Sequence, residues 1–115
     1  MSLTHDFMLC DLPAEVDFES ILSFYRAHRY YAIQIDDKWM LKNWSKFNIV
    51  HAYWQGVAEL ESGLNYCGFS LIPNMYIPEL LKASSAFPYC VVLRKLRILC
   101  TMAMQNNSGI LHMGI

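Results

Sequence analysis

The sequence predicts a single α+β domain in which a small sheet packs against amphipathic helices. The chain has 115 residues, close to the commonest domain size and enough to bury a substantial core. Hydrophobic residues make up 55% of it, so the chain folds rather than remaining disordered. Helical and strand periodicities alternate along it, and neither a repeat nor a linker-like stretch divides it, so one domain is expected over residues 1–115.

The N-terminal half is expected to contain a helix followed by a strand. Asp17 is a favourable N-cap, and the apolar residues after it are spaced mostly by three and four, which predicts a helix over about 17–29. In "YYAIQIDDKW" apolar residues alternate with others, which predicts a half-buried strand ending in a turn at Asp36-Asp37. The segment that holds His5 and Cys10 is expected to be loose.

Residues 43–62 allow two interpretations. Apolar residues at helical spacing favour one helix that ends at Gly63. The many β-branched and aromatic residues favour two strands around Gly56 instead. The compact apolar run "NYCGFSLIP" then predicts a buried strand over 65–72.

Two helices and a strand complete the C-terminal half. Pro78 suits the first turn of a helix over about 77–86. The stretch "YCVVLRKLRILCTMAMQ" predicts a longer amphipathic helix, with an apolar stripe of Val92, Leu96, Leu99 and Ala103 opposite Arg94, Arg97, Thr101 and Gln105. The chain ends in an apolar strand over 109–115, expected to pair with 65–72. Alternation turns Leu111, Met113 and Ile115 toward the helices and places His112 on the other face, within reach of water.

Composition excludes several classes of function. The net charge is −1 and no basic stripe is present, so nucleic-acid binding is not expected. No apolar run approaches the ~20 residues that a membrane span needs. The N-terminus lacks the pattern of a secretory signal, so a cytoplasmic location is expected. The cysteines form no C-x-x-C pair and no histidines lie one helical turn apart, so neither a metal nor a cofactor is expected.

Acidic residues are the candidates for contact with a partner. Residues 1–25 contain five acids and no base, whereas residues 80–115 contain four bases and no acid. An acidic surface would steer a basic partner into place, although the two segments can equally neutralise each other within one domain. With an exposed aromatic anchor added, the candidate partner-binding residues are Glu15, Asp17, Glu19, Asp36, Asp37 and Trp39.

A thiol and an imidazole form the alternative candidate site. Cys67 on the strand over 65–72 and His112 on the last strand would face each other, as the nucleophile and base of a small enzyme or in a ligand-binding domain. The competing interpretation is that Cys67 is a small core residue, because free cysteines are usually buried. A homodimer that covers an exposed apolar face is a further alternative.

The C-terminal half resembles a known kind of protein. "SGLNYCGFSLIP", a short helix, a longer amphipathic helix and the terminal "ILHMGI" resemble a group of small bacterial proteins, some of which are similar to immunity proteins of polymorphic or contact-dependent toxins. The chain departs from their pattern at Asn74, and at Cys67, where an aromatic residue is usual. The resemblance implies a non-enzymatic cytoplasmic protein whose partner is a toxin domain. It assigns no binding residue.

Overall fold

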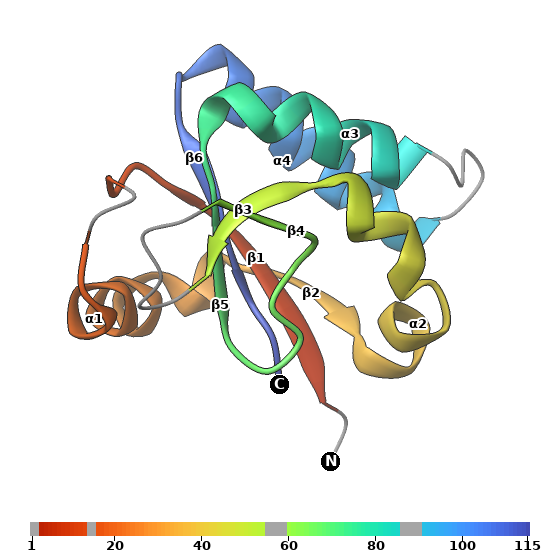
Figure 1. Ribbon diagram of the computed structural model, residues 1–115, viewed down its shortest axis with the longest axis horizontal. Helices are drawn as coiled ribbons and strands as arrows, with labels where there is room; N and C mark the ends of the chain where they lie inside the picture. The colour runs from red at the N-terminus through yellow and green to blue at the C-terminus, as the bar shows by residue number, and fades with distance from the viewer. Residues whose placement is uncertain (1–2, 14–15, 55–59, 86–90) are drawn as a thin grey trace.

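The computed structural model describes residues 3–13, 16–54, 60–85 and 91–115. Across these residues six strands form one antiparallel sheet in the order β2-β1-β6-β5-β3-β4 (Figure 1). The strands are β1 (Thr4–Cys10), β2 (Ile33–Asp36), β3 (His51–Trp54), β4 (Leu60–Ser62), β5 (Phe69–Ile72) and β6 (Gly109–Met113). The α+β class predicted from the sequence is therefore confirmed.

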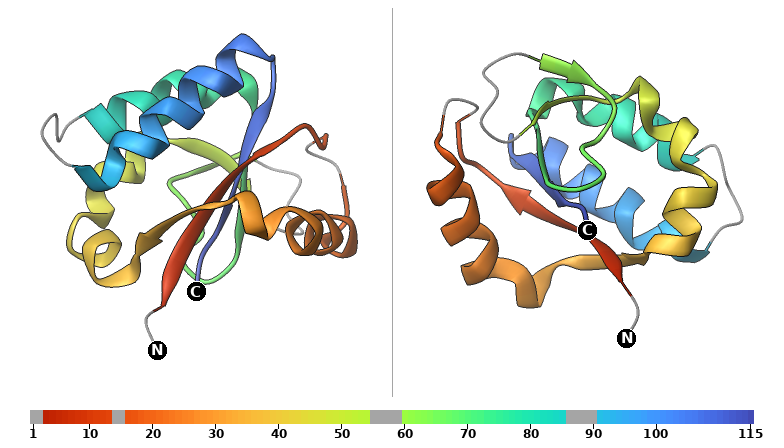
Figure 2. Two further views of the ribbon diagram at one scale, coloured as in Figure 1. Left: turned by 180° about the vertical axis from the view of Figure 1, so that it is seen from behind. Right: turned by 60° about the horizontal axis from the view of Figure 1, so that its bottom comes forward.

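Helices cover both faces of the sheet (Figures 1 and 2). They are α1 (Phe18–His28), α2 (Asp37–Lys42), α3 (Ile77–Ser85) and α4 (Arg94–Gln105), with single 3-10 turns η1 (Arg29–Tyr31), η3 (Asn74–Tyr76) and η4 (Val91–Leu93) and the longer 3-10 segment η2 (Trp44–Ile49). One face packs against α1, and the other against α2, η2, α3 and α4.

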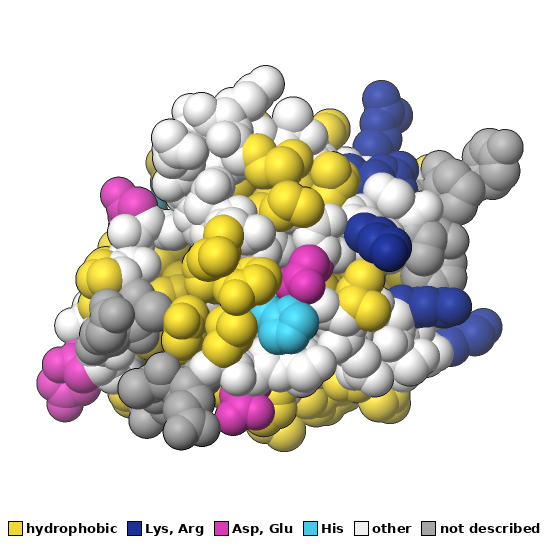
Figure 3. Space-filling model, turned by 45° about the horizontal axis from the view of Figure 1, so that its top comes forward, with side chains coloured by type: hydrophobic (Ala, Val, Ile, Leu, Met, Phe, Trp, Pro, Cys, Tyr) yellow, Lys and Arg dark blue, Asp and Glu magenta, His cyan; other side chains and the backbone are white. Residues whose placement is uncertain are grey.

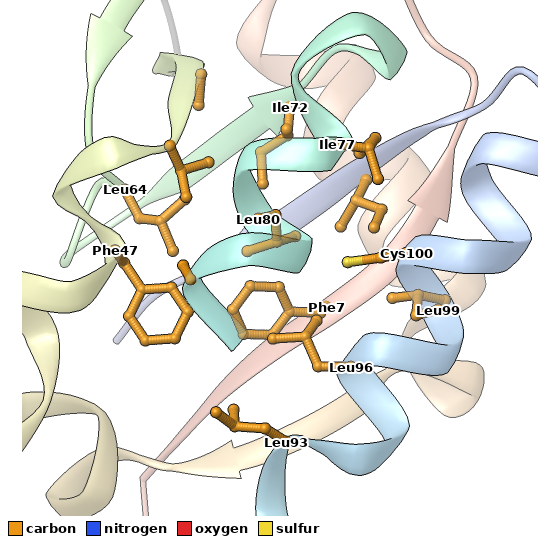
Figure 4. Close-up of a cluster of buried hydrophobic side chains, with 14 of the residues drawn as sticks. Phe7, Phe47, Leu64, Ile72, Ile77, Leu80, Leu93, Leu96, Leu99 and Cys100 are labelled. Atoms are coloured by element: carbon orange, nitrogen blue, oxygen red, sulfur yellow. The ribbon is translucent and has the colours of Figure 1, made fainter. Parts of the chain in front are cut away.

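The larger core lies between the sheet and the second group of helices. Figure 4 shows Phe7 of β1, Phe47 of η2, Leu80 of α3 and Leu96 of α4 pointing toward one another, and all four are fully buried. A smaller cluster on the other face joins α1 to the strands through Ile21, Phe69 and Leu111 among others. Because the central strands are covered on both faces, they show little of the alternation that marks a half-exposed strand.

Several predicted elements are confirmed. Helix α1 begins after Asp17, whose carboxylate accepts a hydrogen bond of 2.8 Å from the backbone N–H of Ser20. Helix α4 buries Leu96, Leu99 and Ala103 of the predicted stripe, and Pro78 lies in the first turn of α3. Val92, the first residue of that stripe, lies in η4 before the helix and is exposed, so this part of the expectation is wrong. The C-terminal strand β6 pairs with β5 as expected. It also pairs with β1, so it lies between these two strands in the sheet.

Residues 43–62 form no single helix, so that expectation is wrong. They form η2 followed by β3 and β4, which pair antiparallel, and this is the two-strand alternative. In β3, Ala52 and Trp54 face the larger core. Residues two apart lie on the same face of a strand, so contacts with the rest of the protein stabilise a strand here rather than a helix. The strand predicted over 65–72 is also shorter than expected, because residues 65–68 form a turn and β5 begins at Phe69.

Three further expectations are corrected. The N-terminal segment is the ordered strand β1 rather than a loose one. The Asp36-Asp37 pair is no hairpin turn, because Asp36 caps α2 through the N–H groups of Lys38 and Trp39. His112 is 0% exposed, because the face of β6 that carries it packs against helices as well.

Candidate functional site

Five side chains from β1, α2, the turn before β5, β5 and β6 form a connected polar chain inside the protein. We call it the histidine network: His5, Asp37, Tyr66, Ser70 and His112. His5 Nε2 lies 2.8 Å from Asp37 Oδ1, and His5 Nδ1 lies 2.9 Å from His112 Nε2. His112 Nδ1 lies 3.2 Å from Ser70 Oγ, and the Tyr66 hydroxyl donates to Asp37 Oδ1.

Every member of the network is satisfied when both imidazoles are neutral and carry their proton on Nε2. The Ser70 hydroxyl then donates to His112, His112 donates to His5, and His5 donates to the carboxylate. Ser70 Oγ also accepts the backbone N–H of Asn65 at 2.7 Å. The hydrogen bonds therefore all run in one direction and end on Asp37.

Burial and hydrogen bonding shift the pKa values of three members of the network. Desolvation holds the pKa of His112 well below 6.5, and a proton on nearby His5 would lower it further, so the His112 ring is neutral. Donation from Tyr66, and then from His5, lowers the pKa of Asp37, so the carboxylate is ionised. The hydrogen bond to Asp37 is the main cause that raises the pKa of Tyr66 to about 12.

The order of hydrogen-bonded groups, a serine, two histidines and an aspartate, resembles that of a nucleophile, a base and an orienting carboxylate. The burial of these groups, however, indicates a structural role. Ser70, His5 and His112 are all 0% exposed, and rings of Phe7, Trp44 and Tyr66 pack around the two imidazoles. A catalytic serine must present its hydroxyl to a substrate, whereas Ser70 Oγ is enclosed and already bonded on both sides. The network therefore ties β6 to β1, β5 and α2.

The structure does not place Cys67 opposite His112, so that expectation is wrong. Cys67 is exposed in the turn that precedes β5, and Ser70 is the residue that pairs with His112 across the strands. Two other cysteines are buried, and burial raises the pKa of Cys10 to about 11 and that of Cys100 to about 12. Such thiols remain protonated at neutral pH and are poor nucleophiles.

The predicted acidic contact residues do not gather at one place. Asp17 and Glu19 are exposed at the start of α1, whereas Asp36 is exposed at the start of α2, and these helices lie on opposite sides of the molecule (Figures 1 and 2). Asp37 is occupied by the histidine network, and Trp39 is half-buried against the larger core. Glu15 lies outside the described residues.

A second pair of histidine and carboxylate lies at the surface. Glu79 of α3 accepts hydrogen bonds from the backbone N–H and from Nδ1 of His51, at 3.0 and 2.9 Å. The His51 ring packs on Tyr76, and Figure 3 shows a histidine beside an acidic side chain at the border of a hydrophobic area. Sequence reasoning missed both histidine–carboxylate pairs, because their partners lie 28 and 32 residues apart.

Surface hollows lie away from the histidine network. One of about 220 Å³ lies where β1 and β5 end and β6 begins, lined by Cys10, Leu12, Ile72, Asn74 and Gly109 among others. A neighbouring hollow shares Cys10 and Asp11 with it. Asp11 is the single charged residue in either lining, so the described walls offer little chemistry for a reaction.

Among the residues that the structure describes, the most exposed aromatic side chains lie just after α1. Tyr30 and Tyr31 of η1 are 88% and 84% exposed, and Arg26 and Arg29 beside them are exposed as well. The chain then enters β2, an edge strand of the sheet. We call the set Arg26, Arg29, Tyr30, Tyr31 and β2 the aromatic edge.

Comparison with known proteins adds no family. No family model matches the chain, and neither a curated protein nor a solved structure is significantly similar to it. Within the residues that the structure describes, no three or more His, Cys, Asp or Glu side chains converge as metal ligands would. In the same residues, no helix combines the length and the apolar character that crossing a bilayer requires.

Proposed function

We propose that this chain is a non-enzymatic protein-binding domain of bacterial type, which neutralises a toxin domain in the cytoplasm as an immunity protein does. The observation that carries the proposal is the exposure of Tyr30 and Tyr31, at 88% and 84%. Tyrosine is among the side chains that contribute most to binding energy when a partner buries them. Two adjacent tyrosines that are almost wholly exposed to water contribute little to the stability of the core. We therefore assign them to contact with another molecule.

The placement of the polar groups supports binding rather than catalysis. In the histidine network His5, Ser70 and His112 are fully buried and the Asp37 side chain is 17% exposed, and their hydrogen bonds are mutually satisfied. The exposed thiol of Cys67 lies in a turn and has no imidazole opposite it in the sheet register. These features favour a rigid scaffold that presents its surface to a partner.

The acidic residues have a smaller part in this proposal. Asp17 and Glu19 remain exposed and can meet basic side chains of a partner at the rim of an interface, where charge affects the association rate more than the affinity. Asp36 is exposed as well, but its carboxylate caps α2. Asp37 is hydrogen-bonded within the histidine network, and Trp39 packs against the larger core, so neither is proposed as a partner contact.

Co-expression with a protein that is encoded by a neighbouring gene and stops cell growth when produced alone tests the proposal. The wild-type chain should restore growth of cells that produce the toxin, and the purified proteins should form a complex of one copy each. Cys67→Ser is the matched control, because it removes the exposed thiol of the enzymatic alternative and should leave rescue unchanged. Absence of both rescue and complex would refute the proposal, and rescue that depends on the Cys67 thiol would favour catalysis.

A further inference from the structure

We propose that the aromatic edge is the docking surface, and that its occupant is an extended acidic segment of the partner protein, which adds a strand to β2. This inference rests on the proposed function and specifies where and what the chain binds. Three independent features of the described residues support it: exposed aromatic anchors, cations without ion pairs, and the free edge of a sheet.

The anchors and the cations lie on one surface because of helical spacing. Arg26 is in the last turn of α1, and Arg29 and Tyr30 follow it by three and four residues, so the three side chains share a face. Neither Arg26 nor Arg29 forms an ion pair with a carboxylate among the described residues. Their charges are therefore available to a partner, and arginine and tyrosine are the residue types enriched at binding hot spots.

The edge strand β2 continues directly from these residues. It pairs with β1 on one side and is the last strand of the described sheet on the other. An edge strand presents unpaired backbone N–H and C=O groups, which an extended segment can pair with while side chains beside the strand set the specificity.

The charge around β2 selects an acidic occupant. Arg26 and Arg29 lie before the strand, and the exposed Lys38 follows it. The one carboxylate on β2, Asp36, accepts hydrogen bonds from the N–H groups of Lys38 and Trp39, so the start of α2 compensates its charge. A second copy pairing antiparallel through β2 would bring the arginines of one protomer near Lys38 of the other, which repel, so a partner of opposite charge fits better.

Helix α4 offers a matched surface that lacks two of these features. Arg94, Lys95, Ile98 and Met102 are exposed along it, so it is basic and partly apolar as well. Lys and Arg side chains also gather on one side of the face shown in Figure 3. However, α4 has no exposed aromatic side chain in its range and borders no strand edge, and it therefore serves as the control.

The experiment is an NMR titration of the full chain with a short capped peptide that alternates glutamate and valine. The largest amide shifts should fall in η1 and β2, and a peptide that alternates lysine and valine should bind at least about tenfold more weakly. Arg26→Glu with Arg29→Glu, and Tyr30→Ala with Tyr31→Ala, should each weaken binding about tenfold or more. Arg94→Glu with Lys95→Glu makes the same charge change on α4 and should weaken it much less.

Other outcomes overturn the inference. Shifts centred on α4, equal binding of the lysine peptide, or equal losses from the two charge reversals would show that β2 is not the acidic-segment site. Light scattering that detects a dimer, lost in Tyr30→Ala with Tyr31→Ala, would mean that a second copy is the occupant. Toxin rescue that survives Tyr30→Ala with Tyr31→Ala would refute this surface but leave the proposed function standing. Peptide binding without rescue by the wild type would refute the function alone.

Discussion

Acidification should destabilise this protein through the buried ring of His112. Its pKa in the folded state lies well below 6.5, because burial removes the water that would solvate the imidazolium and His5 adds repulsion. In the unfolded chain the pKa of His112 lies near its ordinary value of 6.5. Above pH 6.5 the ring is neutral in both states, and below it only the unfolded chain binds the proton, so stability falls as pH falls.

The size of this destabilisation follows from the one proton that the unfolded chain binds at His112 and the folded protein does not. Between the ordinary pKa and the lowered folded-state pKa, each pH unit removes up to about 1.4 kcal/mol of the free energy of unfolding. At about pH 5.5 the loss attributable to His112 is therefore about 1.4 kcal/mol relative to neutral pH. This is a measurable fraction of the 5–15 kcal/mol that is typical of a domain.

Urea unfolding followed by tryptophan fluorescence, at several pH values from about 7.5 to about 5.5, measures the effect. His112→Gln replaces the titrating imidazole with a neutral amide, which can donate and accept hydrogen bonds but does not titrate, so this variant should be less stable at neutral pH and lose less stability on acidification. His28→Gln is the control, because His28 is exposed on α1 and its replacement should leave the wild-type pH dependence intact. Equal pH dependence in the wild type and His112→Gln would refute the reasoning.

Four further variants test the C-terminal segment, one glycine with positive φ and the N-cap of α2. Gly114→Ala should cost at least about 3 kcal/mol in urea unfolding, because its Cβ would overlap the carbonyl oxygen of Tyr66 and lie 2.6 Å from its carbon. Gly63→Ala, whose Cβ meets nothing closer than 3.4 Å, should cost only about 1 kcal/mol from its positive φ, and the reverse order would contradict this account. Asp36→Ala should lower the melting temperature by losing about 1 kcal/mol of N-cap stabilisation, and an unchanged value would mean that the cap is dispensable. Deletion of residues 110–115 should abolish the cooperative transition in circular dichroism or cause aggregation in light scattering, because it removes the strand that joins β1 to β5 and exposes one edge of each, whereas a folded, soluble truncation would show that β6 does not close the sheet.

Local signals in the sequence predicted α1, α3 and α4. The signals were the N-cap at Asp17, the proline in the first turn of α3 and the apolar stripe along α4. Each of them affects only the backbone of the helix in which it lies, so the sequence nearby is enough to detect it. The apolar end of the chain likewise predicted a closing strand. What the strand β6 contacts on its second side was not predictable, because β1 lies at the other end of the chain.

The sequence by itself determined the α+β class, the positions of α1, α3 and α4 and the need to bury its C-terminus, because these follow from periodicity, capping and hydrophobicity along the chain. Tertiary structure alone decided that "THDFMLC" is a strand. His5 and Asp6 are buried there because Asp37 and Tyr25, 32 and 19 residues away, satisfy them. It also decided that His112 is enclosed rather than wet, since its partner His5 lies 107 residues away. A buried polar group is tolerated only when a partner meets it, and a one-dimensional pattern does not contain that partner.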